Sequence, residues 1–369
     1  MAGFCNPPGS PEPLACCAVL NTIATSLEPG LDFAALIQPA PVGARFEDPD
    51  YFVWCSSMIR DADGLCHLFY SRWPKRFGFY AWVTHSEIAR AVADEPMGPY
   101  RHVETVLPAR GAGFWDGACT HNPTINQFEG RYYLYYMGLN ADAAMQGEIS
   151  MEDPAWWTYR NRQRIGVAVA DSPAGPWRRF DRPCIDVSAD ARAPDSLMVS
   201  NPAVARMPDG NYLAVYKAVG KARPLPRGGP VVHLSAVAST PTGPFVKRLD
   251  PIFTAAGSDF PAEDPCIWYQ ESHERFYAIV KDMSGSFTGK GQSLALFESM
   301  DGRGWRRAAQ VLVSDLNLHW EDGRVEQLCN LERPQVWRDG DQPRILFLAA
   351  ARDLHHSFNV HLPLRALSD

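Results

Sequence analysis

The sequence predicts an all-β fold, a five-bladed β-propeller whose four-stranded antiparallel blades surround a central pocket. Two sequence marks that recur in the same order along the chain favour this fold, because a propeller repeats one sheet radially. The composition agrees: 11% of the residues are aromatic, and the 369 residues include 28 glycines and 31 prolines. Such a mixture is typical of many short strands joined by tight turns.

The first mark is the start of an inner strand: two polar residues, a proline, one further residue and an aliphatic residue. Its copies are residues 120–125 (THNPTI), 200–204 (SNPAV), 263–267 (EDPCI) and 332–336 (ERPQV), with a degenerate first copy at 54–59 (WCSSMI). The strands that follow them, rich in Tyr, Phe, Leu or Val, are 66–70, 131–136, 211–216, 275–280 and 344–348. The repeat length of about 65–80 residues suits four strands with functional loops.

The second mark closes the third strand of a unit with Gly-Pro and an aromatic residue. Its copies are 98–100 (GPY), 175–177 (GPW) and 243–245 (GPF), with a looser one at 302–305 (GRGW). Gly-Pro sets a tight turn, and the aromatic residue that follows is expected to pack between neighbouring blades.

The chain divides at about residue 45. Residues 1–45 lie outside the repeat and are proline-rich, so they are predicted to form a partly irregular N-terminal extension, and residues 46–369 the propeller domain. Within the extension, 31–38 (LDFAALIQ) is an alternative outer strand that would close the ring. The long loops 138–163 and 183–200 are expected to cover one face and to carry function.

Charge and motifs restrict the class of function. A net charge of −7 argues against a nucleic-acid partner, which requires a basic face. No apolar run is long enough to cross a membrane, and the N-terminus is a poor secretory signal, so a cytoplasmic location is expected. The nine cysteines have neither metal-ligand nor disulfide-framework spacing, and no cofactor or metal is expected.

The strand starts, the turn at 209–212 (DGNY) and the ending at 172–177 (SPAGPW) resemble the five-bladed glycoside hydrolases of family 43 and its relatives, families 32, 68 and 117. The resemblance covers about residues 46–362. It implies a hydrolase of O-glycosidic bonds in which acids at the starts of the inner strands converge on the central pocket. In that family one Asp is the base or nucleophile, a second Asp tunes the pKa values, and a Glu before x-Pro is the acid.

This resemblance implies a catalytic set of four acids: Asp50, Glu263, Asp264 and Glu332. Glu263 and Glu332 each stand before x-Pro, and one of them is expected to be the acid. The first blade has Cys55 or Ser56 where the family has Asp, so Asp50 is expected to enter from the preceding loop as the base. The stretch 263–265 (EDP) is also similar to one in the family 130 mannoside phosphorylases, which leaves phosphorolysis as an alternative.

The propeller itself predicts a shared substrate site, because the starts of all inner strands face one axis. The predicted substrate-binding residues are Trp54, Arg72, Trp73, Trp115, Asp116, His121, Asn122, Asn201, Lys217, Lys281 and Arg333. Crowded carboxylates cannot all ionise in a poorly solvated pocket, so at least one pKa is expected to rise. Three further tryptophans, Trp82, Trp156 and Trp157, are expected to serve mainly in packing.

The four cations of this set have two readings. Arg72, Lys217, Lys281 and Arg333 either neutralise the acids or hold an anionic group such as a uronate, a sulfate or phosphate. Three functions therefore remain open: an exo-acting glycosidase on an oligosaccharide, with an anionic or modified sugar as one option; a phosphate-dependent phosphorylase; and a sugar-binding propeller without activity.

Overall fold

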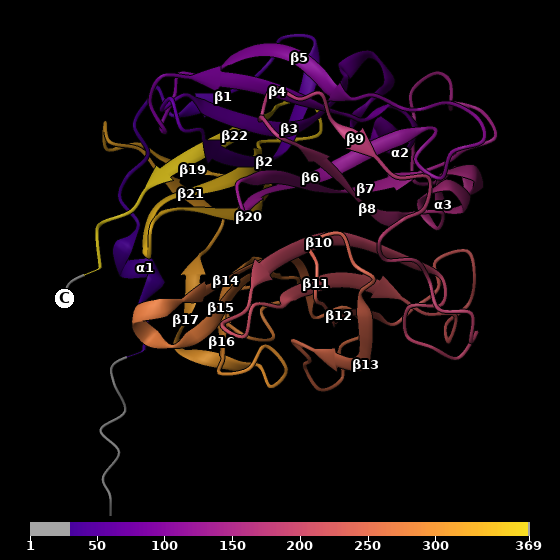
Figure 1. Cartoon of the computed structure of the whole chain (residues 1–369). Helices are drawn as coiled ribbons and strands as arrows, with labels where there is room; N and C mark the ends of the chain where they lie inside the picture. The colour runs from indigo at the N-terminus through magenta and orange to yellow at the C-terminus, as the bar shows by residue number, and fades with distance from the viewer. Residues whose placement is uncertain (1–29, 368–369) are drawn as a thin grey trace, which may run out of the picture. The chain divides into compact units, whose positions relative to one another are not determined.

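The computed structural model describes residues 30–367. Five four-stranded antiparallel sheets follow one another in a ring, so the predicted five-bladed β-propeller is confirmed (Figure 1). The innermost strands β2, β6, β10, β14 and β20 contact one another in that order, and β20 returns to contact β2.

The blades follow chain order, and each runs outward from its innermost strand. Blade 1 contains β2 (Tyr51–Arg60), β3 (Cys66–Pro74), β4 (Glu87–Ala93) and β5 (Arg101–Leu107). Blade 2 contains β6 (Cys119–Phe128), β7 (Arg131–Leu139), β8 (Arg164–Ala170) and β9 (Arg178–Arg179). Blade 3 contains β10 (Met198–Arg206), β11 (Tyr212–Val219), β12 (Val231–Ala238) and β13 (Val246–Ile252).

The last two blades hold the second half of the chain. Blade 4 contains β14 (Ala262–Gln270), β15 (Arg275–Asp282), β16 (Ser293–Ser299) and β17 (Arg306–Ser314). Blade 5 contains β20 (Asn330–Asp339), β21 (Gln342–Ala351), β22 (Ser357–Pro363) and β1 (Arg45–Phe46). The hairpin of β18 (Asn317–His319) and β19 (Val325–Gln327) lies between these blades in the sequence, and a short 3₁₀ turn, η3 (Glu271–His273), joins β14 to β15.

The N-terminal segment closes the ring through β1. Arg45 pairs with Val360 and Phe46 with Asn359, so the indigo β1 lies beside the yellow β22 in Figure 1. The alternative outer strand at 31–38 does not form. Asp32 instead caps a short helix, α1 (Phe33–Leu36), by accepting a hydrogen bond from the Ala35 amide at 3.1 Å, a bond that favours a helical turn.

The hydrophobic core lies between neighbouring blades. Tyr135 and Val167 of blade 2 pack with Tyr212 and Tyr216 of blade 3, and each further pair of adjacent blades shares such a cluster. The Gly-Pro aromatic residues join these clusters as expected. The Trp177 ring meets Phe69 of blade 1 edge to face, with centroids 5.5 Å apart.

Two insertions form a lid over one end of the propeller axis. The first, between β3 and β4, contains the 3₁₀ turns η1 (Lys75–Phe77) and η2 (Phe79–Ala81) and the helix α2 (Trp82–His85). The second lies in the predicted loop 138–163 and contains α3 (Pro154–Arg160). The two insertions share an aromatic cluster, in which the rings of Trp82 and Trp156 pack edge to face with centroids 5.5 Å apart. No helix in residues 30–367 is long and apolar enough to cross a membrane.

Candidate active site

One backbone irregularity recurs in all five inner strands. Each strand shifts register at the same point of its repeat, and the residue there has a positive φ of 52° to 57°. These residues are Cys55, Asn122, Asn201, Asp264 and Arg333. A bulge of this kind re-aims the side chains around it. In four of the five strands a proline follows, which has no N–H to donate to the neighbouring strand.

The five bulge residues lie around the axis, and we call them the axial ring; four contacts join them in sequence order from Cys55 to Arg333. The Cys55 thiol donates to Asn122 Oδ1 at 2.9 Å, and Asn122 Nδ2 donates to Asn201 Oδ1 at 2.6 Å. Asn201 Nδ2 in turn donates to Asp264 Oδ1 at 2.8 Å, and Arg333 Nη1 lies 2.7 Å from the same oxygen. The ring lines a constriction of about 20 Å³ on the axis.

A cavity of about 260 Å³, the axial pocket, lies between the axial ring and the lid. Its floor contains Asn122, Asn201 and Arg333 of the ring. Its walls include the residues that precede ring members in four blades, namely Trp54, His121, Glu263 and Glu332. Further walls come from Trp73, Met137, Gln163, Lys217 and Phe260, and the lid supplies Phe79, Trp82, Met151, Trp156, Trp157 and Arg160.

Each pocket glutamate pairs with a lysine from the preceding blade. Lys217 Nζ lies 2.5 Å from Glu263 Oε1, and Lys281 Nζ donates to Glu332 Oε2. The strand register explains these pairs. Lys217 is paired with Ser200 in blade 3, and Lys281 with Glu263 in blade 4, so each lysine lies beside the innermost strand of its own blade. From there it contacts the glutamate of the next blade. The two glutamate side chains are 16% and 11% exposed, so the pairs are largely desolvated.

The three carboxyl groups nearest the axis in blades 4 and 5 have pKa values that are shifted in different directions. Burial alone would raise the pKa of Glu263, but Lys217, Arg333 and Lys281 outweigh it and lower that pKa to about 2. Lys281 and Arg333 likewise outweigh burial at Glu332 and lower its pKa. Burial together with the two charged glutamates raises the pKa of Asp264 to about 7 despite Arg333. The expected raised pKa is therefore found on Asp264.

His121 is a neutral imidazole in the wall. Its ring stacks on Trp82 with centroids 5.2 Å apart, and its Nδ1 lies 2.7 Å from the Ser86 hydroxyl. Burial, assisted by the charges of Arg333 and Lys217, holds the pKa of His121 well below its usual range. The aromatic neighbours and the neutral state favour a role in shaping the pocket.

Most of the predicted site residues come together, with four exceptions. Trp54, Trp73, His121, Asn122, Asn201, Lys217, Glu263, Glu332 and Arg333 line the axial pocket, Lys281 pairs with Glu332, and Asp264 lies in the axial ring.

Asp50, predicted as the base, lies outside the pocket with an exposed side chain. Tyr51 already pairs with Pro74, and the Asp50 carbonyl accepts a hydrogen bond from the Lys75 amide at 2.9 Å. The segment is therefore tied to β3 and is not a loop free to enter the pocket.

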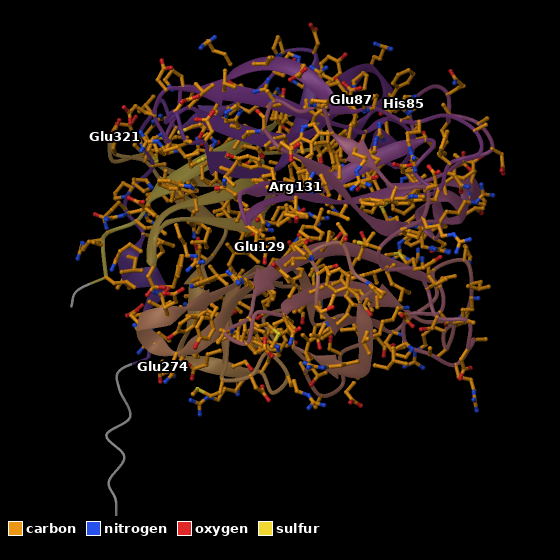
Figure 2. The ribbon with its side chains drawn as sticks, in the orientation of Figure 1. His85, Glu87, Glu129, Arg131, Glu274 and Glu321 are labelled. Carbon is orange, nitrogen blue, oxygen red and sulfur yellow. The ribbon has the colours of Figure 1, made fainter. Side chains whose placement is uncertain are left out.

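Arg72 was predicted among the axial cations and is displaced by one residue. Trp54 pairs with Ser71, so Ser71 holds the position that Lys217 and Lys281 hold in their blades. Successive side chains of a strand point to opposite faces, which turns Arg72 away from the pocket. It pairs instead with Glu87 of β4 at 2.8 Å, a residue labelled on blade 1 in Figure 2.

Trp115 and Asp116 form a buried anchor outside the pocket. Asp116 is fully buried and accepts hydrogen bonds from Arg110 at 2.5 Å and Tyr136 at 2.7 Å, and the Trp115 ring stacks on Tyr136. The neighbouring glycines leave room for them: a Cβ on Gly138 would lie 2.6 Å from the Asp116 side chain. Packing therefore explains both residues.

The lid residues are the part of the site that the sequence prediction missed. Trp82, Trp156 and Trp157 were expected to pack, yet they line the pocket together with Phe79, Met151 and Arg160. The available signal was the density of aromatic residues at 77–82 (FGFYAW) and 151–157 (MEDPAWW), both outside the repeated strands.

Comparison of the sequence with protein-family models and with curated proteins returns no match. Solved structures are similar. The family 117 glycoside hydrolase Zg3597 of Zobellia galactanivorans has a TM-score of 0.58 at 16% identity, covering 92% of this chain and 90% of that one. The catalytic domain of the family 62 α-L-arabinofuranosidase of Coprinopsis cinerea has a TM-score of 0.60 at 10% identity, covering 90% and 99%. The arabinanase Arb43A of Bacillus subtilis has a TM-score of 0.54 at 13% identity, covering 88% and 96%. The chain thus shares its five-bladed fold with glycoside hydrolases of several families.

Proposed function

We propose that this protein is a glycosidase that hydrolyses the O-glycosidic bond of a terminal sugar in the axial pocket, with Glu263 and Glu332 as its catalytic residues. One observation supports this most: two largely buried carboxylates from adjacent blades open into one aromatic-walled pocket. Glycoside hydrolysis requires two carboxyl groups beside the scissile bond, and the aromatic walls offer apolar faces for a sugar ring.

The dimensions of the pocket favour exo action. A volume of about 260 Å³ lies just below the range of about 300–1,000 Å³ for sites of drug-sized ligands, so it suits a single sugar residue with part of a second. The lid encloses the pocket from the side of α2 and α3, which disfavours a long chain passing across the site.

The two glutamates take different roles in this proposal, although both pKa values are lowered in the free protein. Glu263, with a pKa near 2, stays ionised and serves as base or nucleophile. Glu332 serves as the acid. Lys281 and Arg333 lower its pKa in the free protein, so acid catalysis requires that the bound substrate weaken these two contacts. Asp264 lies in the ring below the pocket and acts as a positioning residue through Arg333 and Asn201.

The test is a screen of aryl glycosides and oligosaccharides with native protein and two variants. Glu263→Gln and Glu332→Gln are each expected to lower kcat/KM by about 10³-fold, because each removes a proton-transfer or nucleophilic group. Glu298→Gln is the matched control, since Glu298 is also buried and paired with arginines but lies on β16 outside the pocket. Native protein that hydrolyses no glycoside, or full activity in both pocket variants, would refute the assignment.

A phosphorylase is the second candidate, because the pocket holds one cation, Arg160, without a carboxylate partner among the described residues. That cation is suited to inorganic phosphate. Phosphorolysis would make the rate depend on added phosphate and release a sugar phosphate, so the screen is run with and without phosphate.

A further inference from the structure

Arg160 is the one pocket cation, within residues 30–367, that lacks a carboxylate partner. It ends helix α3, is 9% exposed and lines the axial pocket. Its Nη1 donates to Asn161 Oδ1 at 3.0 Å and weakly to the Arg227 carbonyl at 3.4 Å. In the described part of the chain, Nε and Nη2 have no acceptor, so the rest of the guanidinium is available to a ligand.

Each of the other pocket cations contacts a carboxyl group. Lys217 pairs with Glu263, Lys281 pairs with Glu332, and Arg333 lies 2.7 Å from Asp264. Among the described residues, Arg160 has no such contact. An unpaired buried cation costs folding free energy unless an anion compensates it, so a site of this kind is completed by an anionic ligand.

The chemistry around Arg160 selects a planar anion attached to a ring. A guanidinium presents its N–H groups as a fork that matches a carboxylate in a bidentate way. Gln163, 2% exposed, lines the same pocket, and its side-chain amide group can donate to a carboxylate. Trp157 also lines the pocket next to the cation: Arg160 Cζ lies over its ring, 5.6 Å from the ring centroid. A carboxylate and a sugar ring would thus be held side by side.

We propose that the sugar bound in the axial pocket is a uronic acid whose carboxylate is held by Arg160 with Gln163. The inference rests on the proposed glycosidase function for its catalytic consequence, but the binding of the carboxylate does not depend on cleavage. Arg160 is thereby the residue that determines specificity, while Glu263 and Glu332 perform the reaction.

The first experiment measures binding, by titrating native protein with glucuronic and galacturonic acids and with the matching neutral sugars, glucose and galactose. The readouts are tryptophan fluorescence and calorimetry. Native protein is expected to bind a uronic acid at least about 10-fold more tightly than its neutral counterpart. Inorganic phosphate and sulfate form a separate arm: tight binding of either, without preference for a uronic acid, would overturn the proposal.

The second experiment compares two lid variants. Arg160→Met keeps an unbranched side chain but removes the guanidinium and its charge, and it is expected to abolish the uronic-acid preference. Arg162→Met is the matched control, because Arg162 lies two residues further along, pairs with Asp142 at 3.0 Å and does not line the pocket. It is expected to keep the preference. If Arg160→Met fails to fold, Arg160→Lys replaces it and is expected to retain charge attraction with a several-fold weaker preference.

Failure of this inference and failure of the glycosidase proposal give different results. Preferential uronic-acid binding without hydrolysis of any glycoside would support the carboxylate site and refute the glycosidase proposal. Hydrolysis of aryl glucosides or galactosides as efficient as that of aryl glucuronides or galacturonides would keep the enzyme and overturn the carboxylate site. A preference that survives Arg160→Met would also overturn it.

Discussion

All five blades have the same backbone conformation at the axis, but their side chains there differ. Blades 4 and 5 present charged residues to the axis, and blades 1 to 3 present uncharged ones. All five inner strands bulge at one point with φ between 52° and 57°. Blades 4 and 5 place Glu263-Asp264 and Glu332-Arg333 there, whereas blades 1 to 3 place Trp54-Cys55, His121-Asn122 and Ser200-Asn201. The repeat therefore decides where a side chain points, and the individual blade decides what is presented.

This difference gives the pocket two sides. The charged side holds the carboxylates and, through Lys217 and Lys281, their counterions. On the uncharged side, His121 and Trp54 form a wall, and Asn122 and Asn201 link the axial ring by hydrogen bonds. A sugar in such a pocket meets aromatic surface on one side and reactive groups on the other, which orients its scissile bond.

The largest expected effect is a difference in activity between variants on the charged side and on the uncharged side of the pocket. Glu332→Gln is expected to lower kcat/KM by about 10³-fold, whereas Ser200→Ala, at the equivalent position of blade 3, should cost less than about 10-fold. The reason is that Ser200 donates only to the Asn201 amide oxygen, at 2.6 Å. Steady-state kinetics on one substrate measures both. Equal losses in the two variants would mean that the site works as a hydrogen-bonded frame without dedicated catalytic carboxylates.

The second effect concerns pH and stability. Asp264 keeps its proton up to about pH 7 in the folded protein, but loses it near pH 4 in the unfolded chain. Its contribution to stability is therefore fully present at low pH and is lost as the pH rises through 7. Asp264→Asn removes this pH dependence. Relative to native protein, its free energy of unfolding should therefore increase by about 2–4 kcal/mol when the pH is raised from about 4.5 to 8.

Urea unfolding at the two pH values measures this difference. Asn201→Asp is a useful companion, since it adds a carboxylate beside Asp264 and should make stability fall more steeply with rising pH. A difference between Asp264→Asn and native protein that does not change with pH would show that Asp264 is ionised throughout, and so paired with Arg333 as an ordinary buried salt bridge.

The third effect tests the uncharged side of the axial ring. Asn201→Leu removes the donor to Asp264 and the acceptor for Asn122 together, leaving Asn122 Nδ2 buried without a partner. Its expected cost is about 2–4 kcal/mol of unfolding free energy, from chemical denaturation. As a comparison, Asn126→Leu removes an amide whose Nδ2 has no hydrogen-bond partner in the part of the chain that the structure describes, and it should cost less.

The smallest effect concerns Cys55. Burial holds the pKa of its thiol well above the usual range, so the group is a neutral hydrogen-bond donor to Asn122 and a poor nucleophile. Cys55→Ser keeps a donor and should change stability by less than about 1 kcal/mol. In native protein at pH 8, iodoacetamide should modify the exposed Cys329 long before Cys55, as peptide mass spectrometry would show. Rapid labelling of Cys55 would mean that the ring opens readily.

Much of the fold and half of the site follow from local sequence patterns. Four strand starts with proline at one position, together with the degenerate first copy, predict the five inner strands, and residues at the same position of a repeat must face the same axis. Glu263, Asp264, Glu332, Arg333, Asn122 and Asn201 were predicted on this basis, and all lie at the axis. The positions of Arg72 and Asp50 were wrong because a one-residue difference in register, or a backbone pairing such as that of Tyr51 with Pro74, leaves no mark in composition or spacing.

The sequence by itself determined the architecture and the acids that meet on the axis, because periodicity within a strand and repetition between blades are local properties. Only the tertiary structure decided which lysine pairs with which glutamate, that Arg160 has no carboxylate partner within residues 30–367, and that the two insertions cover the pocket with tryptophans. Those features depend on distances between segments far apart in the chain. Burial and electrostatic coupling arise from such distances, so the pKa shifts of Glu263 and Asp264 appear only when the five blades have assembled.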